Sequence, residues 1–257
     1  MVNKKLDILI LVFAVVILVG INYGKLDSAV VNFFEEKEVV VVERVIDGDT
    51  FVANNESVRL LGINCPERGE IYYSEAKDFL DNLILGKKVV LKFGVDKKDL
   101  YGRKLAYVFY NNENVNKKLV EEGYANIYFL GRDQYYFEFL EAWKNCGKNL
   151  CVKSLDACAS CVNLKKLDYE NEIVVFENIC GIDCDLENWE VKDEGRKKFI
   201  FPNFILDGKG EVSLIVGNKT NTENEIYWDR KDYVWTDGGD TLFLRDDFGK
   251  LVLWKSY

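Results

Sequence analysis

Three short stretches of the sequence hold side chains of the types that can break a phosphodiester bond. Residues 44–50 include the turn Asp47-Gly48-Asp49, residues 59–67 begin with an arginine and end with a glutamate, and residues 99–103 pair an aspartate with an arginine. Oxygen ligands hold a hard cation, and a carboxylate takes a proton from water. Guanidinium groups neutralise charge that grows on phosphate oxygens. Together these stretches predict phosphodiester hydrolysis at a single cation.

The elements that must position these stretches are mostly short strands. Valine-rich or alternating runs bounded by turn signals predict strands at residues 38–46, 51–53, 57–63, 89–93 and 105–110. Asn54-Asn55 is expected to form a tight turn. Five short strands with such turns favour a barrel.

Three helices are expected around these strands. Residues 74–85 place apolar side chains on one face and stop at Gly86, and residues 115–122 stop at Gly123. Residues 133–145 form the third, with Asp133 as the N-cap and with Tyr136, Leu140 and Trp143 on the buried side.

Residues 39–146 resemble the thermonuclease family, the staphylococcal nuclease-like domains, because all three stretches match its signature in order and spacing. The resemblance implies an OB-fold barrel with calcium-dependent nuclease activity. It makes Arg59 and Arg103 the arginines that clamp phosphate, and Glu67 the carboxylate that activates water. It also implies that Asp99 and Tyr101 bind the nucleotide.

The same resemblance implies a calcium site made by Asp49, Asn64 and the main-chain carbonyl of Cys65. The family's type member has Asp where Asn64 stands and Thr where Cys65 stands. Asn keeps a carbonyl oxygen but lacks a full charge, so weaker calcium binding is expected. The change at Cys65 leaves a main-chain ligand intact.

Composition narrows the chemistry. The 257 residues, 48% hydrophobic and 30% charged, suffice for two globular domains. The chain has no histidine, which excludes the Ser-His-Asp triad and histidine-bound zinc. Its net charge of −9 opposes non-specific nucleic-acid binding. The excess of acidic over basic side chains is small in residues 38–150 (16 basic, 18 acidic) and larger in residues 151–257 (14 basic, 21 acidic). Lysines that could face nucleic acid, or simply form a solvated surface, stand at Lys87, Lys88, Lys92, Lys97, Lys98 and Lys104.

The N-terminus indicates export. Residues 8–21 are an uninterrupted apolar run preceded by Lys4 and Lys5, which is typical of a signal peptide. Counted as residues 6–23, the run can also span a bilayer as an uncleaved anchor, which we prefer. Residues 1–37 are therefore assigned to this helix and a spacer, with the rest of the chain outside the cytoplasm, anchored or secreted.

The second half reads as a β-sandwich. Strands are expected at residues 172–177, 189–191, 198–201, 212–216, 225–228, 241–245 and 251–254, with no helix between them and a hairpin turn at residues 246–249. The stretches 173–178, 185–193, 199–202 and 238–246 resemble the lamin-tail family, an immunoglobulin-like sandwich. That resemblance covers residues 167–257 and implies a binding or spacing role with an unknown partner.

We therefore expect a mainly β chain with some α, divided into an OB-fold domain with three helices (residues 38–146), a Cys-rich junction (147–166) and a sandwich (167–257). Seven cysteines are present, of which Cys65 is expected to be unpaired. Cys158, Cys161, Cys180 and Cys184 have the spacing of a structural zinc site, while their even number and export favour disulfides; inert thiols are the third alternative. With Cys146 and Cys151, they are expected to fix the sandwich against the barrel.

The functional hypothesis is an exported calcium-dependent endonuclease that cuts DNA, RNA or both, attached to a membrane if the N-terminal helix is kept. Tyr128 and Phe129 are candidates for base stacking. Two alternatives stay open: a non-catalytic OB-fold that binds nucleic acid, and an envelope adhesion protein in which the sandwich is the working part.

Overall fold

The computed structural model describes residues 37–129 and 133–257, and the predicted N-terminal helix lies outside them. In the first half, one sheet has the order β1-β6-β7-β4-β3-β2, with β8 paired to β7. A separate pair joins β5 to β9. The strands are β1 (Lys37–Val41), β2 (Arg44–Val45), β3 (Thr50–Ala53), β4 (Glu56–Leu60), β5 (Ile63–Asn64), β6 (Lys88–Lys98), β7 (Lys104–Tyr110), β8 (Glu113–Asn114) and β9 (Asn126–Ile127). This sheet is consistent with the predicted OB-fold.

Local backbone preferences explain where these strands end. Asn54 and Asn55 both take positive φ, 51° and 59°, which is the turn that joins β3 to β4. The predicted strand over residues 38–46 is broken at Val42, because its carbonyl accepts from Gly86 and its N–H donates to Lys87. The predicted strand over residues 57–63 ends early, since Gly62 takes a φ of 75° and turns the chain into β5.

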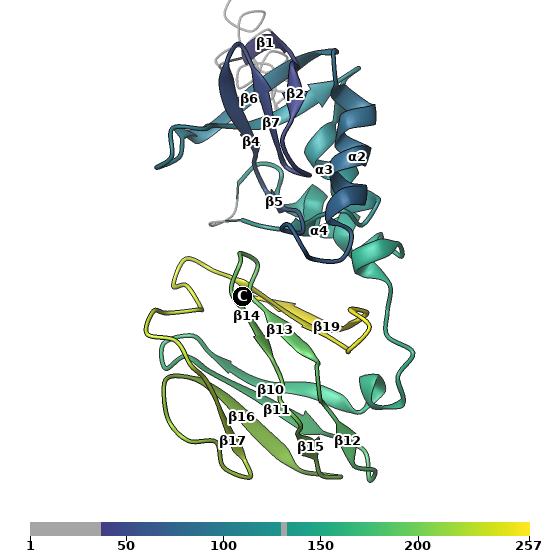
Figure 1. Cartoon of the computed structure of the whole chain (residues 1–257), viewed down its shortest axis with the longest axis vertical. Helices are drawn as coiled ribbons and strands as arrows, with labels where there is room; N and C mark the ends of the chain where they lie inside the picture. Colours follow the sequence, from purple (N-terminus) through teal and green to yellow (C-terminus); the bar gives the residue numbers. More distant parts are fainter. Residues whose placement is uncertain (1–36, 130–132) are drawn as a thin grey trace, which may run out of the picture. The chain divides into compact units, whose positions relative to one another are not determined.

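Three helices pack beside this sheet, α2 (Tyr73–Ile84), α3 (Val115–Glu121) and α4 (Tyr136–Asn145) (Figure 1). The third begins later than predicted, and Asp133 is not its N-cap. The carboxylate of Asp133 instead accepts from the N–H of Tyr135 and the hydroxyl of Tyr107. Phe139, Ala142 and Trp143 are the buried residues of α4, and Tyr136 and Leu140 are partly buried against the same core, so the predicted inward face is correct.

The second half folds as two four-stranded sheets, β10-β11-β16-β17 and β14-β13-β18-β19, with a small β12-β15 pair (Figure 1). This arrangement agrees with the predicted immunoglobulin-like sandwich. Its strands are β10 (Val162–Asp168), β11 (Ile173–Asn178), β12 (Cys184–Asp185), β13 (Glu190–Lys192), β14 (Lys198–Ile200), β15 (Ile205–Leu206), β16 (Glu211–Val216), β17 (Glu225–Trp228), β18 (Thr241–Arg245) and β19 (Leu251–Ser256). The predicted hairpin turn joins β18 to β19.

Three strands of this half were not predicted, namely β10 and the short pair β12 and β15. Most of β10 lies within the expected junction, and it follows two short 3-10 helices, η1 (Asn149–Cys151) and η2 (Ala157–Ser160). A register shift between Leu164 and Lys166 interrupts its alternation of buried and exposed side chains. The period-2 signal that identifies a strand was therefore absent from the sequence.

Barrel and sandwich share a hydrophobic seam within the compact unit Val39–Tyr257. Phe243 and Leu251, from β18 and β19, belong to the same buried cluster as the barrel core. The ring of Trp143 meets Phe243 edge to face, with 5.4 Å between centroids. Arg245, 4% exposed, donates to the carbonyl of Leu150 and to the side chain of Asn126. Buried apolar surface and satisfied polar groups thus hold the two halves together.

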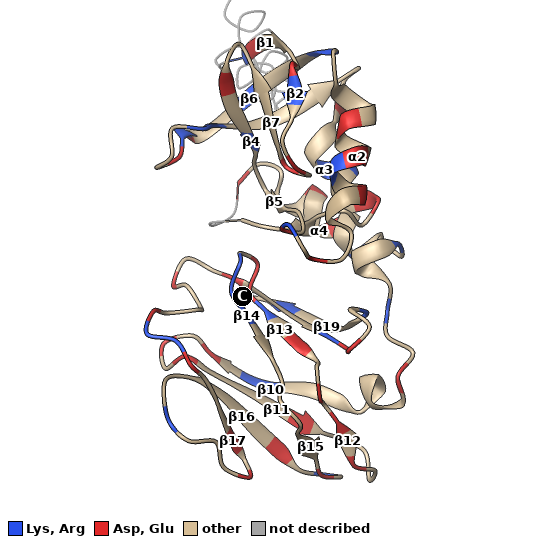
Figure 2. Ribbon diagram, viewed as in Figure 1, with Lys and Arg blue, Asp and Glu red and all other residues tan. Residues whose placement is uncertain are grey.

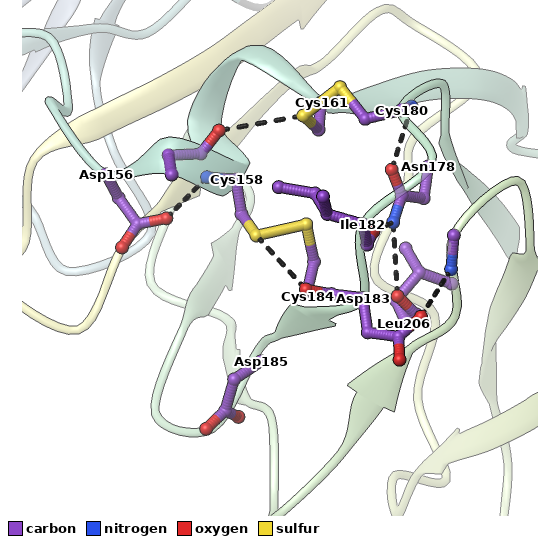
Figure 3. Close-up of a disulfide and its surroundings, with 12 residues drawn as sticks. Asp156, Cys158, Cys161, Asn178, Cys180, Ile182, Asp183, Cys184, Asp185 and Leu206 are labelled. Carbon is purple, nitrogen blue, oxygen red and sulfur yellow. Dashed lines mark hydrogen bonds between the residues drawn. A yellow bond between two sulfur atoms is a disulfide. The ribbon is translucent and has the colours of Figure 1, made fainter.

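Six cysteines form three disulfides, Cys146–Cys151, Cys158–Cys184 and Cys161–Cys180, and Cys65 is a buried free thiol as expected. Figure 3 shows the last two bridges close together, with Asp156 accepting from the N–H of Cys158. The zinc alternative is wrong here, because thiolates ligate zinc and disulfide sulfurs are not thiolates. None of the three bridges formed by the described cysteines joins the barrel to the sandwich strands, so their predicted role as the interdomain link is also wrong.

The predicted membrane-spanning segment, residues 6–23, lies outside the described residues, so the structure does not test it. Over residues 37–129 and 133–257, no helix combines the length and the apolar character that crossing a membrane requires.

Candidate active site

Arg59 on β4 is the centre of the site, and the residue is 8% exposed. One terminal nitrogen, Nη1, donates to the carbonyls of Leu60 and Ile63. The other, Nη2, lies 3.1 Å from Asp49 Oδ2 and donates to Asn64 Oδ1 at 3.0 Å. The turn at the end of β4 therefore folds back around the arginine and fixes its fork.

The turn before β3 supplies two neighbouring carboxylates. Oδ2 of Asp49 accepts from the N–H of Cys65 at 2.9 Å, and Asp47 accepts from the N–H of Asp49. Gly48 is required between them, because a Cβ there would lie 2.8 Å from the Cβ of Cys65. Burial, followed by the charge of Asp49, raises the pKa of Asp47.

The donor atoms of this turn fit a hard cation. Carboxylates of Asp47 and Asp49 and the amide oxygen of Asn64 are the oxygen ligands that calcium prefers. A cation would also offset the like-charge repulsion that raises the pKa of Asp47. The described residues do not, however, include a group of three His, Cys, Asp or Glu side chains suited to a metal. Asn64 and main-chain oxygens would have to complete the shell.

Glu67 lies two residues after Cys65, directly behind Pro66. Its N–H donates to Glu70 Oε2 at 2.9 Å. Its own Oε1 lies 2.7 Å from Nε of Arg196, a residue between β13 and β14 of the sandwich, and its side chain is 41% exposed. The carboxylate is thus accessible but ion-paired.

Arg103 precedes β7 and is held within its own loop. Its Nε lies 2.6 Å from Asp99 Oδ2, and Asp99 Oδ1 accepts from the N–H groups of Tyr101 and Arg103. The parallel pairing of Val58 with Lys104 brings this loop to the start of β4. Within the described residues, Arg103 contacts neither Arg59 nor Glu67. The ring of Tyr101 is 87% exposed and lies 5.6 Å from the guanidinium of Arg103.

The two stacking candidates differ in their surroundings. Phe129 is 9% exposed and packs edge to face on Tyr136 and Phe139, so it is a core residue. Tyr128 is partly buried, and burial raises its pKa. Its N–H donates to the carbonyl of Gly62.

The sequence did not predict that a sandwich hairpin reaches this site. We call residues 193–197, between β13 and β14, the hairpin tip; Figure 2 shows acidic and then basic residues along it. Asn64 Nδ2 donates to the carbonyl of Gly195 at 2.8 Å, and Lys192 Nζ lies 2.9 Å from Glu70 Oε2. Asn64 and Gly195 are 131 positions apart, so no local pattern could reveal the contact.

The tip also buries acidic groups. Burial raises the pKa of Asp193 to about 6, and backbone hydrogen bonds, which lower this pKa, offset part of the effect. Burial and the charge of Asp240 raise the pKa of Glu194 to about 9, and burial raises that of Asp240 to about 6. Burial thus favours the neutral form of each carboxylate, and of the three only Glu194 has a pKa high enough to stay mainly protonated at neutral pH.

The guanidinium of Arg59 lies beside the carboxylates of the Asp47–Asp49 turn, and the accessible Glu67 follows further along the chain. This arrangement on an OB-fold is that of a phosphodiester-cleaving enzyme. Comparisons with known proteins agree. Residues 57–149 match the model of staphylococcal nuclease homologues, and residues 159–257 match that of the lamin tail domain.

The sequence is 34% identical to the thermonuclease of Staphylococcus hyicus over 147 residues, which are 52% of this chain and 86% of that protein. It is 35% identical to the thermonuclease of Staphylococcus intermedius over 122 residues, 43% of this chain and 73% of that protein. Endonuclease YhcR of Bacillus subtilis is 32% identical over 108 residues, 35% of this chain but 9% of that protein. The chain belongs to the thermonuclease family, and it is an endonuclease, a hydrolase that acts on nucleic acid.

Proposed function

We propose that this chain is an exported, calcium-dependent nuclease that hydrolyses the phosphodiester bonds of DNA, RNA or both. The observation that carries the proposal is the buried cluster of Arg59, Asp49 and Asn64, with Glu67 at its accessible edge. It combines a phosphate-binding fork, oxygen ligands and a base in the stretch of the barrel from the turn before β3 to the residues after β5.

In the proposed reaction, Glu67 takes a proton from the attacking water. Arg59 and Arg103 neutralise the charge that develops on the phosphate oxygens; such donors are typically worth about 10²–10³ in rate each. Asp99 orients Arg103, and Tyr101 offers an exposed ring to the nucleotide. Because Arg103 points to its own loop, substrate has to draw it away from Asp99.

Calcium is assigned to Asp49, Asn64 and the main-chain carbonyl of Cys65, and Asp47 is added as a further candidate ligand. Bound there, the ion supplies Lewis-acid polarisation of the phosphate. The oxygen donors and the raised pKa of Asp47 support this assignment.

Export is proposed from the thermonuclease likeness and from the three disulfides, which persist in oxidising compartments. The same proposal covers two forms of the exported protein, one anchored by its N-terminal segment and one from which that segment is cleaved. We propose the domain division at residues 38–146, 147–166 and 167–257 as well, with a binding or spacing role for the lamin-tail half.

A digestion assay tests the proposed function. Purified protein should cut single- and double-stranded DNA and RNA with calcium, and lose that activity when a chelator is added. Glu67→Gln should lower kcat by at least about 100-fold without unfolding the barrel. Glu56→Gln is the matched control, because Glu56 is also ion-paired and similarly exposed, at 40%.

Arg103→Ala should also remove most cleavage while circular dichroism stays unchanged. Full activity in Glu67→Gln or in Arg103→Ala would reject the assigned chemistry. Binding of nucleic acid without any cleavage would instead favour the non-catalytic OB-fold.

A further inference from the structure

The hairpin tip of the sandwich lies on the residues assigned to catalysis. The carbonyl of Gly195 accepts from Asn64 at 2.8 Å, and Nε of Arg196 lies 2.7 Å from the carboxylate of Glu67. One contact engages a proposed calcium ligand and the other the proposed base. Both come from neighbouring residues of one tight turn.

The strands behind the tip are firmly anchored. Lys192 is 6% exposed and pairs with Glu70, which Lys198 also approaches at 3.4 Å. The N–H of Asp193 donates to the carbonyl of Lys197, and the N–H of Lys197 donates back to the Asp193 carboxylate. The tip is therefore a closed, pre-shaped loop held against the barrel at its base.

Under this tip the site is shut. Asp49, Arg59 and Asn64 are 7%, 8% and 4% exposed. The four hydrogens on the terminal nitrogens of Arg59 already have partners, namely the carbonyls of Leu60 and Ile63 and the side chains of Asp49 and Asn64. A phosphate that is to be clamped needs some of those hydrogens and a path to reach them.

Asn64 suits this closed form better than an acidic residue would. Its Oδ1 accepts from Arg59 while its Nδ2 donates to Gly195, so both ends of the amide are used. A carboxylate has no hydrogen to donate to the Gly195 carbonyl, and its charge would repel that oxygen. The amide thus links the phosphate-binding arginine to the hairpin.

We propose that the hairpin tip is a gate over the nuclease site. It is held shut by the Asn64–Gly195 hydrogen bond, by a hydrogen bond from the N–H of Phe129 to the Glu194 carboxylate, and by the Glu67–Arg196 ion pair, and it is opened by nucleic acid. Arg196 is 66% exposed by side chain, so backbone phosphates can reach it and draw it from Glu67. That exchange frees the base when substrate arrives. The inference rests on the proposed function, because it assigns the gate to the same site.

The test uses the full chain with Arg196→Gln, which removes the ion pair and keeps most of the side-chain length. With a short single-stranded oligonucleotide at concentrations below KM, kcat/KM should rise about threefold to fivefold, because the hydrogen bonds of the tip remain. Hydrogen exchange measured by mass spectrometry should speed up in peptides covering residues 193–198 and stay unchanged in peptides covering β18.

Lys165→Gln is the matched control. It removes one positive charge and one exposed ion pair, with Glu211, from the same half of the chain. Its kcat/KM should stay within about twofold of the wild-type value. In wild-type protein, calcium together with a non-cleavable phosphorothioate oligonucleotide should also speed exchange in residues 193–198.

A fall in kcat/KM for Arg196→Gln would overturn the gate and make Arg196 a substrate-binding residue. Unchanged cleavage together with unchanged exchange would show that the tip is a fixed part of the fold. If wild-type protein does not cut with calcium, the proposed function fails, and the exchange comparison between wild type and Arg196→Gln still decides whether the ion pair holds the tip.

Discussion

The two disulfides of the sandwich are nested, and their nesting makes a quantitative prediction. Cys158–Cys184 closes 26 positions, and Cys161–Cys180 closes 19 positions inside them. In the chain-entropy treatment, each bridge taken alone stabilises the fold by about 3–3.5 kcal/mol. With the inner bridge closed, however, the outer one restricts only about seven further positions and contributes about 2.3 kcal/mol.

The perturbation is therefore a cycle of paired alanine variants. Cys158→Ala with Cys184→Ala should cost about 2.3 kcal/mol, and Cys161→Ala with Cys180→Ala about 2 kcal/mol. Removing both bridges should cost about 5.5 kcal/mol, roughly 1 kcal/mol more than the two separate losses together. Alanine is preferred to serine, because Cys184 and Cys161 are 0% and 3% exposed and a buried hydroxyl would lack a partner.

Urea unfolding without reductant gives the four free energies of unfolding. Thiol labelling of the denatured, unreduced wild type is the check on the starting state, and it should find one thiol, that of Cys65. The nested-loop reasoning would be refuted if the losses of the two single-bridge variants added up to the loss of the variant that lacks both bridges. A cost near 3.5 kcal/mol for removing the outer bridge alone would refute it too. Seven reactive thiols would refute the disulfides themselves.

Three further predictions concern the site and its hairpin. Lys192→Met should destabilise the chain by about 2–3 kcal/mol in urea unfolding, somewhat below the cost of breaking a lone buried pair because Lys198 still approaches Glu70. Lys166→Met, at an exposed pair with Asp168, should cost less than about 1 kcal/mol. Burial raises the folded-state pKa of Asp240 from 3.8 to about 6, so stability should fall as pH rises between those values. Asp240→Asn should recover up to about 3 kcal/mol of that loss above pH 6 and nothing below pH 4, as thermal unfolding at each pH would show. Asn64→Asp should tighten calcium binding about tenfold in a calcium titration, since it restores a charge to the shell; weaker binding would remove residue 64 from the ligands.

Much of the fold could be predicted because its signals are local. Alternating valines, glycine stops and the Asn54-Asn55 turn act within a few residues, and each predicts an element that the structure contains. The predictions failed where a distant partner decided the outcome. Asp133 binds the hydroxyl of Tyr107 instead of capping α4, and a register shift disguises β10.

The candidate site divides in the same way. The contact between Asp49 and Arg59 follows from neighbouring strands, whose register pairs Thr50 with Arg59. The contact between Glu67 and Arg196 depends on tertiary packing of two separate folds, and an arginine in a charged hairpin looks like any solvated residue in the sequence. Sequence motifs therefore predict the side chains of the candidate site but not what covers them.

The energetics favour opening of the gate by movement of the hairpin tip rather than by separation of barrel and sandwich. Separation would expose Phe243 and Leu251, each worth about 1.5–3 kcal/mol of buried apolar surface, and would strip Arg245 of its partners on Leu150 and Asn126. The tip is held on the barrel by two hydrogen bonds, Asn64 to the Gly195 carbonyl and the Phe129 N–H to the Glu194 carboxylate, each worth about 1 kcal/mol, and by one exposed ion pair, worth about 0–1 kcal/mol. A closed form favoured by about 2–3 kcal/mol leaves roughly one to three molecules in a hundred open at any moment, since each 1.4 kcal/mol is a tenfold ratio. That ratio limits how far any change confined to the tip can raise activity.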